Sequence, residues 1–475
     1  MSPTKKPTKS KATKKATKKP TKTTTSAVDA AAPRPVPEVG PLRGMKVPKI
    51  VDRILPNGLR VVAAKRSGVP RVEARMLVPT ARGNAGDQAQ LQLLSKTILS
   101  GTEAHTSREI AEELQGLGGS LDAGSASEEV VLFGSALASD LRPFLALLAE
   151  VVEGANYPQG EVEIERDRLV QEISLGRSQP EMVAREAFLG RLFGKHPYGR
   201  GLPDPDRVAK VTSKNLRKVH TERVRPEGAV LVIVGDVAPA KAADAAASAF
   251  GKWAGGGAAP GLAQGVVAKP GKTLIVNRPG SVQTNIRIGG PGVMRDAADY
   301  PALALANLVF GGYFISRLVD NIREEKGYTY SPGSGVQQWR RGSNVIVVAD
   351  VGTDVTAPAL VEMRYELSRM VAGPYTDAEL TSAKRYLAGT ASMGIQTQSG
   401  LAANLANLAA AGLPFEFMRD YPKRVEALTA EEVRAASERY FSPRNLHTVL
   451  VGDADAIVGP VSAFDDVEVV DAVGG

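Results

Sequence analysis

A stretch from the middle of the chain returns near its C-terminus. Residues 208–236 align without a gap onto 425–453, an offset of 217, with eight identical positions. Both copies run from a threonine through an amphipathic segment and a proline turn into an apolar run that ends in Gly-Asp. A shared order of elements indicates an internal duplication. A chain of 475 residues has room for two such domains of roughly 200 residues each.

The pattern within each copy predicts both strands and helices. The apolar runs 229–234 and 446–451 predict strands, and Asn57-Gly58 between β-prone runs predicts a hairpin. Four further segments show the spacing of amphipathic helices: 106–117, 140–152, 161–174 and 377–390. We therefore predict an α+β fold of two similar domains in tandem, each a mostly antiparallel sheet packed with helices.

Composition suggests where the domains end. Residues 254–270 are rich in Gly and Ala with two prolines, which is typical of a linker. We assign an N-terminal domain to 48–253 and a C-terminal domain to 271–475. Residues 1–47, rich in Lys, Thr and Pro, are predicted to be a disordered tail.

The tail accounts for the net charge of +8. Nine lysines lie within residues 1–28, and the other 50 basic residues nearly balance the 51 acidic ones. Such a tail is either a polyanion-binding arm or a solubilising or spurious extension. The second interpretation is the simpler one, since translation could start at Met45. No signal or transit pattern and no stretch of transmembrane length is evident, so we expect a cytoplasmic protein without a transmembrane segment.

Cysteine and histidine usage restricts the chemistry. The chain has no cysteine, which excludes disulfides, thiolate metal sites and a cysteine nucleophile. The four histidines, His105, His196, His220 and His447, are too far apart in sequence for a local zinc site. His196 precedes Pro197 and Tyr198 in what we expect to be a structural turn.

Six stretches resemble, in order, motifs of the pitrilysin/insulinase family of zinc metallopeptidases. They are LPNGLRV from residue 55, QLLSKTILSGT from 92, EIAEELQGLGGS from 109, ERDRLVQEI from 165, HPYG from 196 and REEKGYTY from 323. The resemblance spans about 52–453 and is closest to the short two-domain members, such as the mitochondrial processing peptidase subunits. It implies two similar insulinase-like domains per chain and a chamber that holds peptide.

The resemblance also implies a lost zinc site. Active members carry His-x-x-Glu-His, whose histidines bind zinc and whose glutamate is the general base, with a further glutamate downstream. Here these positions hold Gln92, Ser95 and Lys96, while the downstream glutamate persists as Glu172, with Glu165 one heptad earlier. Gln is a poor ligand, Lys is a cation and Ser is no base, so we predict no bound metal and no catalytic residue in this chain alone.

Glu165 and Glu172 have two interpretations. Arg168 stands three residues after one and four before the other, which favours an ordinary surface ion ladder. In the alternative, Lys96 replaces the charge of the zinc ion and pairs with Glu172 inside the former site, where an unpaired buried carboxylate would be costly. Replacing Lys96 by Ala would then destabilise the fold clearly.

The second domain carries a pair with a different role. In two-chain members of the family, the partner without zinc supplies an Arg and a Tyr seven residues apart, which reach the substrate carbonyl and the developing oxyanion. Arg323 and Tyr330 match that spacing and context. A guanidinium and a phenol both donate hydrogen bonds to negative charge. Alternatively, Arg323 caps a helix end beside its neighbouring glutamates and Tyr330 packs in a strand.

Three functions follow from these patterns. The first is a non-catalytic subunit of a heterodimeric insulinase-like metallopeptidase, inactive alone, whose homologous partner binds Zn²⁺ while this chain completes the peptide chamber and donates Arg323 and Tyr330. The second is a peptide-binding or structural assembly subunit without a peptidase partner. The third is an autonomous enzyme that uses Glu172 and a distant histidine.

Overall fold

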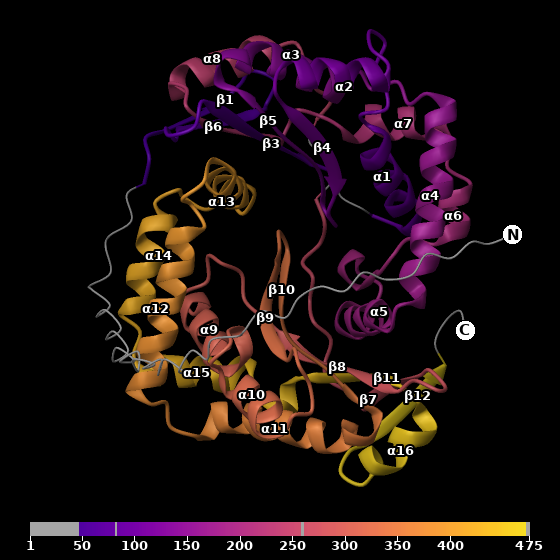
Figure 1. Cartoon of the computed structure of the whole chain (residues 1–475), viewed down its shortest axis with the longest axis vertical. Helices are drawn as coiled ribbons and strands as arrows, with labels where there is room; N and C mark the ends of the chain where they lie inside the picture. The colour runs from indigo at the N-terminus through magenta and orange to yellow at the C-terminus, as the bar shows by residue number, and fades with distance from the viewer. Residues whose placement is uncertain (1–46, 81–82, 258–260, 472–475) are drawn as a thin grey trace, which may run out of the picture. The chain divides into compact units, whose positions relative to one another are not determined.

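The computed structural model describes residues 47–80, 83–257 and 261–471 (Figure 1). These described residues belong to one compact unit. Its strands make two six-stranded sheets, one from each half of the chain. The predicted tail, apart from residue 47, lies outside the described residues.

The first sheet is mostly antiparallel. Its strands are β1 (Ile50–Ile54), β2 (Arg60–Lys65), β3 (Arg71–Pro79), β4 (Ser120–Ser125), β5 (Glu129–Leu137) and β6 (Val230–Gly235). They lie in the order β1-β2-β6-β3-β5-β4, and only β2 and β6 run parallel. The predicted hairpin is present: β1 and β2 pair antiparallel, and Gly58 takes φ +89° in the turn between them.

The second sheet repeats this order. Its strands are β7 (Thr273–Asn277), β8 (Gln283–Pro291), β9 (Gly333–Trp339), β10 (Gly342–Gly352), β11 (His447–Gly452) and β12 (Val467–Asp471). The order β12-β7-β11-β8-β10-β9 matches the first sheet strand for strand, with β7 and β11 parallel. Only the edge differs: β1 comes from the start of the first half, whereas β12 comes from the end of the second and runs parallel to β7.

The offset found in the sequence also relates the structures. Helices α7 (Ser213–Arg223) and α15 (Ala430–Tyr440) begin and end at positions related by that same offset, as do β6 and β11. Thr212 and Thr429 each accept a hydrogen bond from the backbone N–H three residues on, in capping boxes. The duplication is therefore structural as well as sequential.

Helices pack against both sheets. Those of the first half, besides α7, are α1 (Ala85–Thr97), α2 (Ser107–Gly116), α3 (Leu141–Gly154), α4 (Gln159–Ser178), α5 (Pro180–Phe193), α6 (Pro205–Ala209) and α8 (Pro239–Phe250). Those of the second, besides α15, are α9 (Tyr300–Asn307), α10 (Arg317–Val319), α11 (Thr356–Ala372), α12 (Asp377–Met393), α13 (Gln398–Ala410), α14 (Phe417–Glu426) and α16 (Ala454–Ser462). The short helices are η1 (Ala138–Asp140), η2 (Pro197–Gly199), η3 (Leu308–Gly312), η4 (Asp320–Glu325), η5 (Thr353–Val355) and η6 (Pro443–Asn445), of which η3 and η4 are π-helices.

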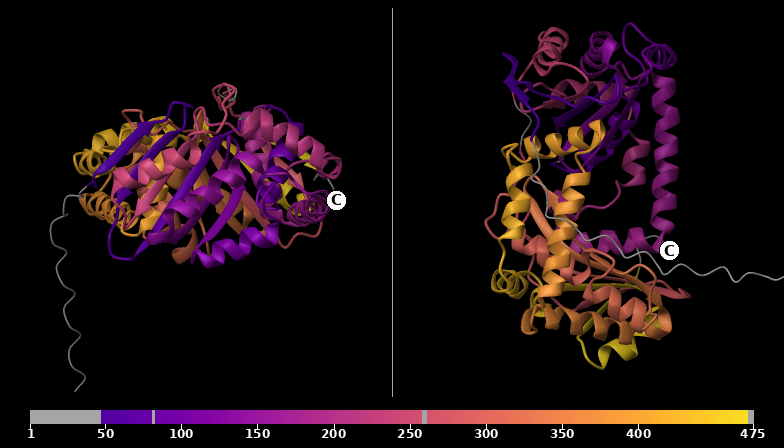
Figure 2. Two further views of the ribbon diagram at one scale, coloured as in Figure 1. Left: turned by 90° about the horizontal axis from the view of Figure 1, so that it is seen from above. Right: turned by 60° about the vertical axis from the view of Figure 1, so that its left-hand side comes forward.

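Each sheet is covered on one face by a helix from the other half. Along β2, Val61 and Ala63 face the core of the first half, while Val62 and Ala64 pack with α13. In the second sheet the corresponding face packs against α5. Figures 1 and 2 show α13 against the first sheet and α5 against the second. Because both faces are covered, the central strands are continuous apolar runs.

One helical stretch, Tyr300–Glu325, is long and apolar enough by composition to cross a membrane, but 67% of its apolar window is buried inside the fold. It forms part of the core of the second half. The predicted fold class is confirmed, with two similar mixed sheet-and-helix halves. The proposed boundaries at 253/254 and 270/271 stay predictions.

Candidate functional site

The positions at which the resemblance implies a lost zinc site, here called the degenerate zinc frame, lie on two helices that pack together. Gln92, Ser95 and Lys96 lie on α1, and Glu165 and Glu172 lie on α4. Helix α1 begins at an Asn84 capping box, and buried leucines on α1 hold it against the core. Ser95 is buried, and its hydroxyl donates to the backbone carbonyl of Gln92.

Lys96 pairs with Glu172. Its Nζ lies 2.8 Å from Glu172 Oε2, so the contact that the alternative interpretation expects is present. The side chains are 31% and 48% exposed, however. The expectation that this pair is buried is wrong, because the side chains of α1 and α4 meet here at the protein surface and not in the core. A half-exposed pair stabilises a fold by about 0–1 kcal/mol.

The predicted ion ladder on α4 is present in part. Arg168 Nη1 contacts Glu165 Oε1. Glu172, four residues beyond Arg168, pairs across helices with Lys96 instead. The two glutamates on this face of α4 therefore have different partners.

These residues do not fit a zinc ion. The ammonium of Lys96 contacts the one retained carboxylate, and Gln92 and Ser95 supply neither an imidazole nor a base. Across residues 47–80, 83–257 and 261–471, no cluster of three His, Cys, Asp or Glu side chains could hold a metal. An autonomous enzyme built on Glu172 and a distant histidine has no ligand set in that part of the chain.

Arg323 and Tyr330 lie together in the second half. Arg323 is on η4, and Tyr330 is in a bend between η4 and β9. The guanidinium carbon lies 4.8 Å from the centre of the Tyr330 ring and 4.6 Å from that of Phe314. The alternative that Tyr330 packs in a strand is wrong, because its side chain is 81% exposed and precedes β9.

The guanidinium of Arg323 retains free donors. Within the part of the chain that the structure describes, its one ion pair is with the adjacent Glu324, at 3.4 Å from Nε. Among the described residues, no hydrogen bond engages the two Nη groups of Arg323. No hydrogen bond between described residues links Arg323 or Tyr330 to Lys96 or Glu172. Stacked on rings at this distance, a guanidinium still presents N–H groups at its edge.

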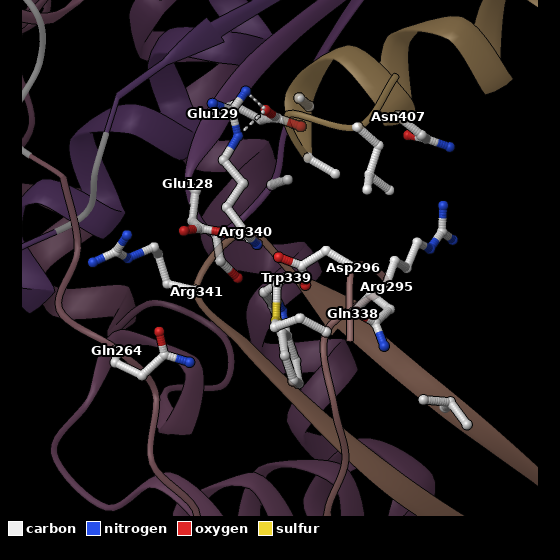
Figure 3. Close-up of a pocket in the computed structure, with 17 residues that line it drawn as sticks. Glu128, Glu129, Gln264, Arg295, Asp296, Gln338, Trp339, Arg340, Arg341 and Asn407 are labelled. Carbon is white, nitrogen blue, oxygen red and sulfur yellow. Dashed lines mark hydrogen bonds and ion pairs between the residues drawn. The ribbon is translucent and has the colours of Figure 1, made fainter. Parts of the chain in front are cut away.

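Two cavities lie where the halves meet. The larger, about 540 Å³, is lined from both halves, including Glu128, Arg295 and Asn407 (Figure 3). The smaller, about 430 Å³, is lined partly by α5 and includes Gln92 of the degenerate zinc frame. Both cavities share a wall formed by Ala126, Ser127, Gln338 and Trp339.

That wall is held by bonds between two hairpin tips. Arg340, in the turn between β9 and β10, donates from Nε and Nη2 to Glu129 Oε2 at 3.2 and 2.6 Å (Figure 3). Its backbone N–H donates to Glu128 Oε2 at 2.7 Å. The tip of β4 and β5 is therefore joined to the tip of β9 and β10 across the two halves.

Tyr198 strengthens the same junction. Its ring stacks on Trp339 at 4.8 Å, and its hydroxyl accepts from the backbone N–H of Arg341. Burial and the neighbouring Glu128 raise the pKa of Tyr198 well above its ordinary value. The predicted turn at His196 is confirmed as η2, with His196 accepting from the Tyr198 N–H.

The sequence did not reveal this junction. Glu128 and Glu129 lie in the first half and Arg340 in the second, and each is an ordinary hairpin-tip residue when considered alone. A usable signal was the duplication itself, since the two tips occupy the same place in the repeated strand order.

Comparison with known proteins supports the resemblance. Residues 92–206 match the model described as insulinase (peptidase family M16), and 210–387 match the one described as the peptidase M16 inactive domain. An uncharacterized zinc protease of Mycobacterium leprae is 25% identical over 395 residues, covering 82% of this chain and 89% of that protein. One from Mycobacterium bovis is 27% identical over 399 residues, covering 82% and 90%.

Solved structures share the fold. A peptidase M16 inactive domain from Pseudomonas fluorescens superposes with a TM-score of 0.79 at 24% identity, covering 85% of this chain and 98% of that one. A protease from Helicobacter pylori also gives 0.79, at 20% identity, covering 86% and 100%. The chain is therefore a homologue of the insulinase (M16) zinc proteases, with both the N-terminal and the inactive-type C-terminal domain of that family.

Proposed function

We propose that this chain is the non-catalytic subunit of a heterodimeric insulinase-like metallopeptidase. The observation that carries the proposal is the asymmetry between its two candidate sites. In the first half, Lys96 engages the one retained zinc-site carboxylate at 2.8 Å. In the second half, the Nη groups of Arg323 have no hydrogen-bond partner among residues 47–80, 83–257 and 261–471, and Tyr330 beside them is exposed. Zn²⁺ belongs to the partner, a homologous chain with the complete motif.

The task of Arg323 and Tyr330 follows from their chemistry. Peptide hydrolysis at the partner's zinc site develops negative charge on the scissile carbonyl oxygen. A guanidinium edge and a phenol hydroxyl each donate hydrogen bonds to such an oxygen and stabilise the transition state. The stacking of Arg323 on two rings limits the orientations of its donors, which lowers the entropy lost on binding.

The substrate is an extended peptide. Strand β4 is an edge strand of the first sheet, and its last residue, Ser125, lines the smaller cavity. An edge strand offers unpaired backbone groups to which a peptide can add as a further strand. We place the complex in the cytoplasm, and treat weak polyanion contact through residues 1–28 as a separable property of the tail.

The test is reconstitution with a zinc-bearing homologue, sought first as a neighbouring gene. The mixture should cleave peptides, and Arg323→Ala should lower kcat by roughly 10²–10³-fold without changing assembly. Tyr330→Phe removes only a hydroxyl and should lower it less. Arg444→Ala, at an exposed arginine on η6, is the matched control. Turnover unaffected by Arg323→Ala and Tyr330→Phe would refute the catalytic role.

The second candidate function is a peptide-holding or assembly subunit without a peptidase partner. The lined cavities and the free edge at β4 favour it equally. Purification from the native source distinguishes the two, because only the first requires a zinc-bearing homologue to accompany the chain.

A further inference from the structure

Two large apolar side chains that contact Arg323, and one that is adjacent in sequence to the first of them, are exposed. Phe314 and Ile315 form a turn between η3 and α10 and are 63% and 66% exposed, and Tyr330 is 81% exposed. Their neighbour Tyr313, by contrast, is half-buried and packs on Tyr386 with ring centres 5.0 Å apart. The segment therefore turns outward at Phe314.

Phe314 and Tyr330 contact a guanidinium whose Nη groups have no hydrogen-bond partner among the described residues. The Arg323 side chain is only 24% exposed, and its guanidinium carbon lies 4.6 Å from the centre of the Phe314 ring. Phe314 therefore packs on the guanidinium and is still 63% exposed. A cationic hydrogen-bond donor beside an apolar surface matches one peptide residue: a backbone carbonyl next to an apolar side chain.

The geometry points to Phe314 and Ile315 as an apolar subsite that selects a large apolar side chain in an extended peptide, adjacent to the carbonyl that Arg323 binds. This inference rests on the proposed function, since it takes Arg323 as a peptide-binding residue. It adds the substrate class. An extended peptide fits better than a folded partner, because the Nη groups of Arg323 need a hydrogen-bond acceptor close to the apolar surface of Phe314 and Ile315.

The experiment measures peptide binding to the full-length chain by fluorescence anisotropy. The probes are fluorescent peptides of one length with an Ala-based sequence, which carry Phe, Leu, Ala or Asp at each position in turn. At one position, Phe and Leu should bind roughly tenfold more tightly than Ala. The Phe314→Ala Ile315→Ala double variant should lose that preference. Its affinity for the all-Ala peptide should fall by a smaller factor, because Phe314 also helps to orient Arg323.

Control variants separate the subsite from general effects. Phe314→Leu keeps an apolar surface and should retain most of the preference. Val282→Ala removes an apolar side chain that is 84% exposed elsewhere in the same half and should change nothing. Absence of peptide binding, or of a Phe and Leu preference, would overturn the inference. So would a preference that survives the double variant, or a double variant that alters only the oligomeric state.

This inference and the proposed function fail in different ways. If the preference depends on Phe314 but Arg323→Ala leaves turnover of the complex intact, the subsite stands and the catalytic role of Arg323 falls. If turnover depends on Arg323 but no side-chain preference exists, the function stands and the subsite falls.

Discussion

The two halves of this chain share one strand order but differ at the places where chemistry could occur. In both sheets the second and third strands run parallel, β2 with β6 and β7 with β11. The strands that follow across the sheet are antiparallel and lie in corresponding order. In the first half, the candidate position holds an ion pair between Lys96 and Glu172. In the second half, it holds Arg323 stacked on exposed rings. The duplicated core constrains apolar residues, whereas surface positions on the same scaffold are free to diverge.

A second lesson is that the halves depend on each other. Helix α13 covers the first sheet, and α5 covers the second. Either half alone would expose an apolar sheet face. The difference between the halves is therefore one of chemistry, while their stability is shared.

The largest expected effect on the free energy of unfolding comes from truncating a side chain that packs on the sheet of the opposite half. Leu405 on α13 and Phe188 on α5 are both fully buried against the opposite half's sheet. Leu405→Ala should cost about 2–5 kcal/mol and Phe188→Ala about 3–5 kcal/mol, because each leaves a cavity. Urea unfolding followed by circular dichroism should still show one transition. Two separate transitions would show that the halves unfold independently.

The next effect compares a buried pair that differs between the halves. Tyr157 OH lies 2.7 Å from His220 Nδ1 in the first half. In the second, Tyr375 OH lies 2.6 Å from Ser437, which occupies the position equivalent to His220 in the duplication. Burial lowers the pKa of His220 to about 4. Between about pH 6.5 and pH 4, His220 is therefore protonated in the unfolded chain but neutral in the folded chain.

The free energy of unfolding should consequently fall by about 3 kcal/mol as the pH drops through that window. His220→Ser, which copies the second half, should flatten this dependence when denaturation midpoints are measured between pH 7.5 and 4.5. His105 acts in the opposite direction: its hydrogen bond to Glu150 raises its pKa, so its contribution is lost as pH rises. An unchanged slope in His220→Ser would contradict the assignment.

A smaller effect concerns the bond that joins the two hairpin tips. Arg340→Ala removes two donors from a largely buried Glu129 and should cost about 1–2 kcal/mol. Arg341→Ala is the control, because the Arg341 contact with Tyr198 is made by its backbone N–H. Thermal denaturation of both variants gives the comparison. Equal melting temperatures would mean that the guanidinium of Arg340 does not stabilise the junction.

The smallest expected effect is at the degenerate zinc frame. Lys96→Ala should lower stability by no more than about 1 kcal/mol, because the pair with Glu172 is half-exposed. Adding NaCl to about 0.5 M should reduce the difference from the unmodified chain further. A loss of several kcal/mol would instead indicate a pair that is desolvated in solution.

Much of the fold followed from local patterns. The offset between the two copies, the runs 229–234 and 446–451 and the capping threonines Thr212 and Thr429 predicted paired elements, and the structure has them. The contact of Lys96 with Glu172 was one of two interpretations, and it came from the resemblance to a family zinc site rather than from a local pattern. The exposure of these two side chains could not be predicted, because it depends on how α1 and α4 pack relative to the protein surface.

The sequence could not predict that α5 packs against the second sheet and α13 against the first. An amphipathic helix shows which face is apolar but not which sheet will cover it. The same holds for Arg340 with Glu129, whose contact depends on how two distant hairpins meet. Tyr330 was ambiguous for a related reason: an aromatic residue next to a β-prone run fits a strand and an exposed bend equally well.

The most direct test of the account is zinc content measured together with peptidase activity on one homogeneous sample of the full-length chain. The chain alone should hold far less than one Zn²⁺ per molecule by atomic emission and should leave test peptides intact, and a zinc-bearing homologous partner should restore cleavage that depends on Arg323. One tightly bound Zn²⁺ per chain with unaided peptide cleavage would contradict the account.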